Sequence, residues 1–247
     1  MPEMSVTARL RAIGEERPAV HCLTNTVVQG LTANMLLAVG AIPSMSADIR
    51  EIRDFVKGAA ALLVNLGTLD AARIEANAAA IETATANNIP WILDPVLIDR
   101  AAARCRTAKE LMRLRPALIR GNAGEIAMLA ADAKTLAQKT GAIVAVTGAT
   151  DYVTDGTCEI TLEGGHMLMS RVTGIGCAGT ALLGAFCGVT ERADYLNATA
   201  AGLQLLGSAG ELAARDVAGP GTFAARLLDE IFKAGKASLQ NSRKDND

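Results

Sequence analysis

The chain has 247 residues, of which 50% are hydrophobic, 20% are charged and 3% are aromatic, and its formal net charge is −2. This length predicts one large α/β domain or two small ones, and the apolar content excludes a disordered chain. The balance of 24 basic against 26 acidic residues, with so few aromatic side chains to stack on bases, argues against nucleic-acid binding.

The first 147 residues alternate between helical spacing of apolar residues and short apolar runs. Helices are predicted at Val27–Val39, Ala71–Asn87, Ala108–Leu114 and Glu125–Thr140. Strands are predicted at Ala59–Leu66, Pro90–Asp94, Ala117–Arg120 and Ala142–Thr147. Apolar strands without alternation are typical of a parallel sheet that is covered on both faces.

The second part of the chain begins with a predicted β-hairpin, Tyr152–Thr154 and Cys158–Leu162, around the turn signal Asp155-Gly156. Three helices and a polar, frayed tail follow at Ala178–Val189, Asp194–Arg215, Thr222–Lys233 and residues 236–247. No shift in composition marks a boundary, so we expect a single domain over residues 1–247. Its expected class is α/β, with a mostly parallel central sheet, helices on both faces and a short antiparallel extension.

Cysteine and histidine usage excludes several kinds of site. Five irregularly spaced cysteines without a C-x-x-C motif do not predict a disulfide scaffold, and they favour a reducing cytoplasm. Two histidines are too few for a His-rich zinc centre or an H-E-x-x-H protease. The longest apolar runs, such as Ala59–Val64, fall far short of the ~20 residues that span a bilayer, so no membrane association is expected.

Polar residues that directly follow the predicted strands are the first candidates for a ligand site, because open α/β sheets bind ligands at the carboxyl ends of their strands. These residues are Asn65–Thr68, Asp94-Pro95, Arg120–Asn122 and Thr147-Gly148, with the glycine loop Thr173–Cys177 ahead of a predicted helix.

The glycine loop combines flexible backbone with a helix start, whose unpaired N–H groups and dipole favour an anion such as phosphate. Cys177 is expected in the first helical turn, where its pKa should fall. A tight turn with Cys177 as a small buried residue is the alternative. Gly174, Gly176 and Gly179 also match G-x-G-x-x-G, but no acid follows at the spacing of a dinucleotide-binding unit.

Three charged residues at these strand ends suit a phosphorylated ligand. Asp94 and Glu125 are candidate Mg²⁺ contacts, direct or through water, with helix capping or plain solvation as alternatives. Arg120 is a candidate for bidentate phosphate binding, with a surface salt bridge as its alternative. On the residues alone, Asn25 either caps a helix or lines a pocket, and Met45 is more typical of a core position.

The chain resembles the hydroxyethylthiazole kinase family of the ribokinase-like superfamily over roughly residues 10–235. Five segments carry the resemblance: VHCLTNTVVQGLTANMLLAVGAIPSM (20–45), LVNLGTL (63–69), IRGNAGEI (119–126), VTGATDYVTDG (146–156) and VTGIGCAGTALLGAF (172–186). The first and last are specific to the family. The resemblance implies a ribokinase-like three-layer fold and Mg²⁺-dependent transfer of the ATP γ-phosphate to the alcohol of 5-(2-hydroxyethyl)-4-methylthiazole, in thiamine salvage.

The resemblance also implies residue roles. Met45, Gly174, Asn25 and Val27 would line the thiazole site, and Arg120 and Thr147 would bind ATP. Asp94 and Glu125 would organise Mg²⁺ and phosphates, and Cys177 stands where related sugar kinases carry an aspartate base. The family is typically a homotrimer with sites between subunits.

Three alternative functions stay open, and two departures from the family's pattern motivate one of them, a non-catalytic relative. The family usually reads DPVGVGAT where this chain has Asp94–Arg100 with Leu97 and Ile98, and G-T-G-C where it has Ile175. One alternative is another ribokinase-like kinase, such as one for hydroxymethylpyrimidine. A second is a non-catalytic thiazole-binding relative, and a third is an NAD-dependent oxidoreductase.

Overall fold

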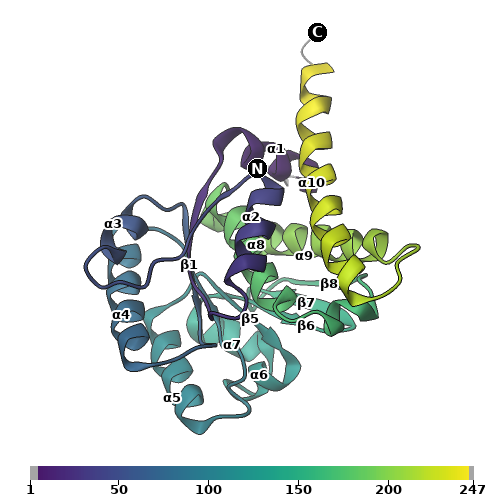
Figure 1. The fold of residues 1–247 in the computed structure, drawn as a ribbon. Coiled ribbons are helices and arrows are strands. Elements are labelled where there is room, and N and C mark those ends of the chain that lie inside the picture. The colour runs from purple at the N-terminus through teal and green to yellow at the C-terminus, as the bar shows by residue number, and fades with distance from the viewer. Residues whose placement is uncertain (1–4, 245–247) are drawn as a thin grey trace.

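The computed structural model describes residues 5–244, in which eight strands form one sheet of order β2-β1-β3-β4-β5-β6-β7-β8 (Figure 1). The strands are β1 (Ala19–Leu23), β2 (Ile42–Ser44), β3 (Ala61–Asn65), β4 (Trp91–Asp94), β5 (Leu118–Asn122), β6 (Ile143–Thr147), β7 (Thr150–Thr154) and β8 (Glu159–Glu163). Strands β1 to β6 pair in parallel, whereas β7 runs antiparallel to β6 and β8. The predicted parallel sheet with an antiparallel extension is therefore confirmed.

The described helices cover both faces of this sheet. They are α1 (Val6–Glu16), α2 (Gln29–Val39), α3 (Ile52–Lys57), α4 (Ala71–Ala86), α5 (Ala102–Leu111), α6 (Ala123–Ala127), α7 (Ala133–Thr140), α8 (Ile175–Gly188), α9 (Tyr195–Ala213) and α10 (Pro220–Lys244), with short 3-10 helices at Met112–Leu114, Met167–Arg171 and Arg192–Asp194. Between residues 5 and 244 no helix combines the length and the apolar character that a membrane span requires.

Two hydrophobic clusters lie on opposite faces of the sheet. The first joins apolar residues of α1, α2, α8, α9 and α10, and the second joins those of α3, α4, α5, α6 and α7 (Figure 1). Every residue of β3 and β4 is buried, because side chains on both faces of these strands meet helices. This double burial explains the unbroken apolar runs in the sequence and confirms a three-layer arrangement.

Short elements at the open edge of the sheet were not predicted. Strand β2 has three residues, one of them Pro43, and α3 has six, so neither is long enough to show a period. Helix α1 and strand β1 also went unpredicted, although Ser5 caps α1 by accepting a hydrogen bond from the Ala8 N–H at 3.2 Å.

The prediction of one helix over Glu125–Thr140 is wrong, because this segment forms two helices. The structure breaks it into α6 and α7, and Asp132 begins the second helix by accepting a hydrogen bond from the Thr135 N–H at 2.7 Å. An aspartate side chain that accepts a hydrogen bond from the backbone acts as an N-cap. Asp132 therefore starts a new helix instead of continuing the first one.

The frayed tail predicted from residue 236 is also wrong as far as residue 244, because α10 continues to Lys244. Ser238 is buried, and Leu239 packs so closely on α1 that a Cβ at Gly14 would lie 2.9 Å from its Cδ1 atom. Apolar contact with α1 therefore extends the helix through a polar sequence. The last part of the predicted tail, residues 245–247, lies outside the described residues, as do residues 1–4 of the predicted domain.

Candidate active site

The carboxyl ends of the parallel strands bring most of the predicted site residues to one edge of the sheet. Asn65 and Asp94 are register partners at the ends of β3 and β4, and Asn122 and Thr147 are partners at the ends of β5 and β6. Because all these strands point the same way, side chains far apart in the sequence meet at this edge.

Asp94 is buried at this edge and is held by neighbouring side chains. The Asn65 amide donates to its Oδ2 atom at 2.8 Å, and the Thr180 hydroxyl on α8 donates to the same atom at 2.9 Å. Burial raises the pKa of Asp94, and the charges of Arg120 and Glu125 act on it in opposite directions. Both donors reach Oδ2, and neither binds Oδ1.

Arg120 lies between Asp94 and the glycine loop. Its guanidinium passes so close to α8 that a Cβ at Gly176 would lie 2.9 Å from Nη1, so only glycine fits there without displacing the arginine. The same side chain lines a cavity of about 540 Å³ together with Thr147, Gly148 and Asp151. The apolar residues of the lining are Met167, Met169, Ile175, Leu203 and Leu206.

Both carboxylate oxygens of Glu125 accept hydrogen bonds from backbone N–H groups. Its Oε2 accepts from the Asn122 N–H at 2.9 Å within a capping box, and its Oε1 accepts from the Leu97 N–H at 2.7 Å. Leu97 adopts φ +59°, a left-handed conformation that leucine rarely takes. The backbone thus makes this hydrogen bond with a leucine at a left-handed position.

The glycine loop begins α8 with a left-handed residue. Gly174 has φ +92°, and a Cβ on it would lie 2.5 Å from Val28, so glycine is required on both grounds. The first N–H groups of an α-helix have no intrahelical acceptor, and those of α8 start beside Arg120. This arrangement suits an anion at the helix start, and an anion site there stays a prediction.

The pKa predicted for Cys177 is wrong in direction. Burial, followed by the charge of Asp94, raises the pKa of the thiol to about 11. The Asn25 amide lies 3.6 Å from the sulfur and 3.5 Å from the Asn65 side-chain oxygen, so Asn25 belongs to the same cluster. The thiol is therefore protonated at neutral pH.

The remaining predicted substrate residues lie toward the open edge of the sheet. Met45 directly follows β2 and is half-buried against the first hydrophobic cluster. Val27 is 77% exposed, two residues beyond Asn25. The structure thus brings Asn25 to Cys177 but leaves Val27 facing outward.

Thr180 and Asp151 belong to this region but were not predicted. Thr180 lies one helical turn after Gly176 on the same face of α8, a spacing that points its hydroxyl to the same edge. Asp151 accepts a hydrogen bond from the Gly148 N–H at 3.0 Å, and burial raises its pKa. The sequence offered one signal for Asp151, because this carboxylate comes only three residues after Gly148 at the predicted strand end.

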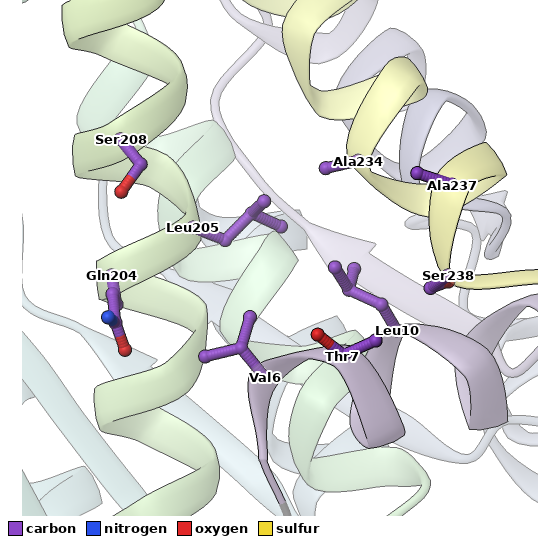
Figure 2. Close-up of a pocket in the computed structure, with 9 residues that line it drawn as sticks. All are labelled: Val6, Thr7, Leu10, Gln204, Leu205, Ser208, Ala234, Ala237 and Ser238. Carbon is purple, nitrogen blue, oxygen red and sulfur yellow. The ribbon is translucent and has the colours of Figure 1, made fainter. Parts of the chain in front are cut away.

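A second cavity, of about 310 Å³, lies between α1, α9 and α10 (Figure 2). Its lining residues are Val6, Thr7, Leu10, Gln204, Leu205, Ser208, Ala234, Ala237 and Ser238. None of these side chains is ionisable, so this cavity offers neither charge for phosphate nor a ligand set for a cation. The edge around Asp94 and Arg120 is the better candidate for chemistry.

Comparison with known proteins gives consistent matches along the chain. The hydroxyethylthiazole kinase family matches residues 10–134 and 128–236. A hydroxyethylthiazole kinase of Serratia proteamaculans (strain 568) is 42% identical, with 97% of each chain covered, and one of Akkermansia muciniphila is 44% identical, with 92% of this chain and 91% of the relative covered.

Solved structures extend these matches to the fold. The hydroxyethylthiazole kinase protein of Pyrococcus horikoshii OT3 superposes with a TM-score of 0.90 at 36% identity, with 95% of each chain covered. A ribokinase-like superfamily protein of Enterococcus faecalis V583 gives a TM-score of 0.68 at 13% identity, with 95% of this chain and 91% of that chain covered. This second likeness shows that the fold is ribokinase-like.

Proposed function

The chain belongs to the hydroxyethylthiazole kinase family, and we propose that, as one kinase domain, it transfers the γ-phosphoryl group of ATP to the alcohol of 5-(2-hydroxyethyl)-4-methylthiazole. The observation that carries this proposal is the meeting of Arg120, Asp94 and the start of α8 at one edge of the sheet. Phosphoryl transfer depends mainly on positioning and charge stabilisation, and these groups supply both.

The cavity beside Arg120 suits a nucleotide. Arg120 and Thr147 would contact phosphate oxygens, and the apolar side with Met169 and Leu206 would receive the base. The N–H groups at the start of α8 would face the transferring phosphoryl group, where negative charge spreads over its oxygens.

The carboxylates at this edge fit a Mg²⁺ ion that is held largely by nucleotide phosphates. Mg²⁺ in such sites takes one or two carboxylates together with phosphates and water. Oδ1 of Asp94 meets this need directly, whereas both oxygens of Glu125 accept N–H groups, so Glu125 would act through water. Among residues 5–244 no cluster of three or more metal-ligating side chains occurs, which also favours an ion brought with the nucleotide. The ion would neutralise charge on the phosphates.

The alcohol would bind on the other side of the glycine loop. Asn25, Met45 and Gly174 lie on the face of the sheet that carries α2 and α8, and Val27 extends from the same segment. Cys177 lies between Asn25 and Asp94, so its thiol would shape the pocket where the hydroxyl meets the phosphoryl group.

We expect Cys177→Ser to keep kcat within about tenfold of the wild type, and Cys177→Asp to retain measurable turnover. With a pKa of about 11, only about one thiol in a thousand is ionised at pH 8, and a loose transition state asks little of a base. Removal of an essential general base would instead lower kcat by about 10²–10⁴. Steady-state kinetics at saturating ATP measures kcat, and a folded, ATP-binding Cys177→Asp protein without turnover would refute the prediction.

The direct test of the proposed function measures ADP release and thiazole phosphate with Mg²⁺-ATP and the hydroxyethylthiazole. Hydroxymethylpyrimidine is the matched alcohol. Product from the thiazole alone supports the proposal, and product mainly from the pyrimidine moves the activity to another ribokinase-like kinase. A melting temperature that rises with the thiazole, without product, would identify a binding relative.

The open edge of the sheet supports a homotrimer with sites between subunits. Val27, Ile42, Ile49 and Phe55 are exposed apolar residues of the segment that surrounds β2, the edge strand. Exposed apolar residues near an edge strand are typical of an interface.

We expect light scattering at micromolar concentration to give about three times the 25.6 kDa chain mass. Ile42→Glu should shift the mass toward one chain, because it places a charge in the interface. Exposed Leu114, in the 3-10 helix that joins the central strands β4 and β5 away from the β2 edge, provides the control Leu114→Glu. A wild-type mass of 25.6 kDa would overturn the trimer.

A further inference from the structure

His21 is a fully buried histidine in the middle of β1, and both of its ring nitrogens bind the chain around the end of β2. Nε2 lies 2.9 Å from the Ser46 carbonyl oxygen, and Nδ1 lies 2.8 Å from the Ser44 hydroxyl. A carbonyl only accepts, so Nε2 carries the proton and donates it, and Nδ1 of the neutral ring accepts from Ser44. Burial lowers the pKa of His21, which keeps this neutral form at pH 7.

Helix α3 packs on the same ring through Phe55. Phe55 stacks on His21 with ring centroids 5.5 Å apart and an interplanar angle of 18°. The Ser46 hydroxyl in turn donates to the Glu51 carboxylate, one residue before α3. His21, Ser44, Ser46 and Phe55 therefore form one packed unit, which we call the histidine brace.

Met45 is the residue between the two braced serines. Ser44 is the register partner of His21 and turns its hydroxyl to the ring, on the side of the sheet where α3 lies. Successive residues of an extended segment point to opposite sides, so Met45 points the other way. There it packs on the cluster that contains Met35 of α2 and Ile175 of α8.

We propose that His21 is a positioning residue for the alcohol substrate, because it fixes the backbone on both sides of Met45 and so holds that side chain toward the glycine loop. The inference rests on the proposed function insofar as it takes Met45 as an alcohol contact. Nothing in the brace touches the cavity beside Arg120, so the nucleotide side is independent of it.

The test replaces His21 with phenylalanine, which keeps a stacked ring but loses both hydrogen bonds. We expect the Kd of the hydroxyethylthiazole, measured by calorimetry, and its KM to rise about tenfold, with the KM of ATP within twofold of the wild type. His21→Gln, whose amide can still donate to the Ser46 carbonyl, should recover part of the affinity. Leu136→Ala, in the second hydrophobic cluster on α7, is the control for general destabilisation.

A double-mutant cycle with Met45→Ala separates positioning from packing. If His21 acts through Met45, His21→Phe will change the thiazole Kd little in the Met45→Ala background. An equal change in both backgrounds, an equal rise in the KM of ATP, or the same loss in Leu136→Ala would overturn the inference.

Binding and activity measurements on the wild type distinguish failure of the proposed function from failure of this inference. Thiazole binding without phosphorylation refutes the kinase activity, and the calorimetric cycle still decides the role of His21. A wild-type protein that does not bind the thiazole at all overturns both.

Discussion

Replacing Arg120 with methionine will lower kcat for thiazole phosphorylation about 1,000-fold, on the scale of arginine residues that stabilise phosphoryl transfer in other enzymes. The guanidinium lies against Gly176 at the start of α8 and acts on the charge of Asp94. Its removal would leave the transferring phosphoryl group without its nearest side-chain cation. Methionine keeps much of the length of the side chain, so the melting temperature should change little.

Two further variants make this result specific. Arg120→Lys keeps the charge but loses the planar fork, and we expect it to restore part of the rate. Arg113→Met removes an exposed arginine from the 3-10 helix after α5 and should leave kcat unchanged. A value of kcat within threefold of the wild type for Arg120→Met would exclude Arg120 from phosphoryl transfer.

Replacing Asp194 with asparagine will destabilise the protein by about 3–5 kcal/mol, the range for an ion pair that loses one partner and leaves the other charge buried. Arg9 of α1 is 1% exposed and pairs with Asp194 before α9, whereas the Asp194 side chain is 29% exposed. The Arg9 Nε atom is already buried without a hydrogen-bond partner. Loss of the Asp194 charge therefore leaves the buried Arg9 cation without its ion-pair partner.

The unequal exposure predicts unequal effects for the two partners. Arg9→Met should destabilise less, since Asp194 keeps water and the Asn197 amide at 2.7 Å. The double variant should be more stable than Asp194→Asn alone, because it removes the buried charge. Thermal and denaturant unfolding measure these differences, and a fall of about 10 °C in Tm is expected for Asp194→Asn. Equal losses for the two single variants would contradict the argument.

The strands of the sheet centre could be predicted because strands that are buried on both faces consist of consecutive apolar residues, as in residues 61–64 of β3 and 91–93 of β4. Local patterning does not reveal elements whose existence depends on tertiary pairing. Strand β2 exists because β1 lies beside it, and residues 236–244 are helical because α10 packs on α1. Long-range contact, absent from local spacing, decides both cases.

The candidate site also has residues that could be placed from the sequence and properties that could not. Parallel strands explain why Asp94, Arg120 and Thr147 could be placed together, and helix capping, the alternative given for Glu125, is present as a capping box with Asn122. The ionisation of Cys177 could not be predicted, because the sequence shows a helix start but neither the burial of the thiol nor the nearby Asp94. The role of His21 depends on a strand and a short helix that spacing alone does not reveal.

The two hydrophobic clusters differ in the stretch of chain that each needs, and this sets an order in which the molecule can be completed during synthesis. The cluster under α3 to α7 draws its buried residues from Leu23 to Val144, so it can close once the first six strands have left the ribosome. The opposite cluster joins Leu10 of α1 to Ile231 of α10 and waits for the end of the chain. Until then α1 and α2 keep an apolar face uncovered, so aggregation of the unfinished chain would begin in its N-terminal region.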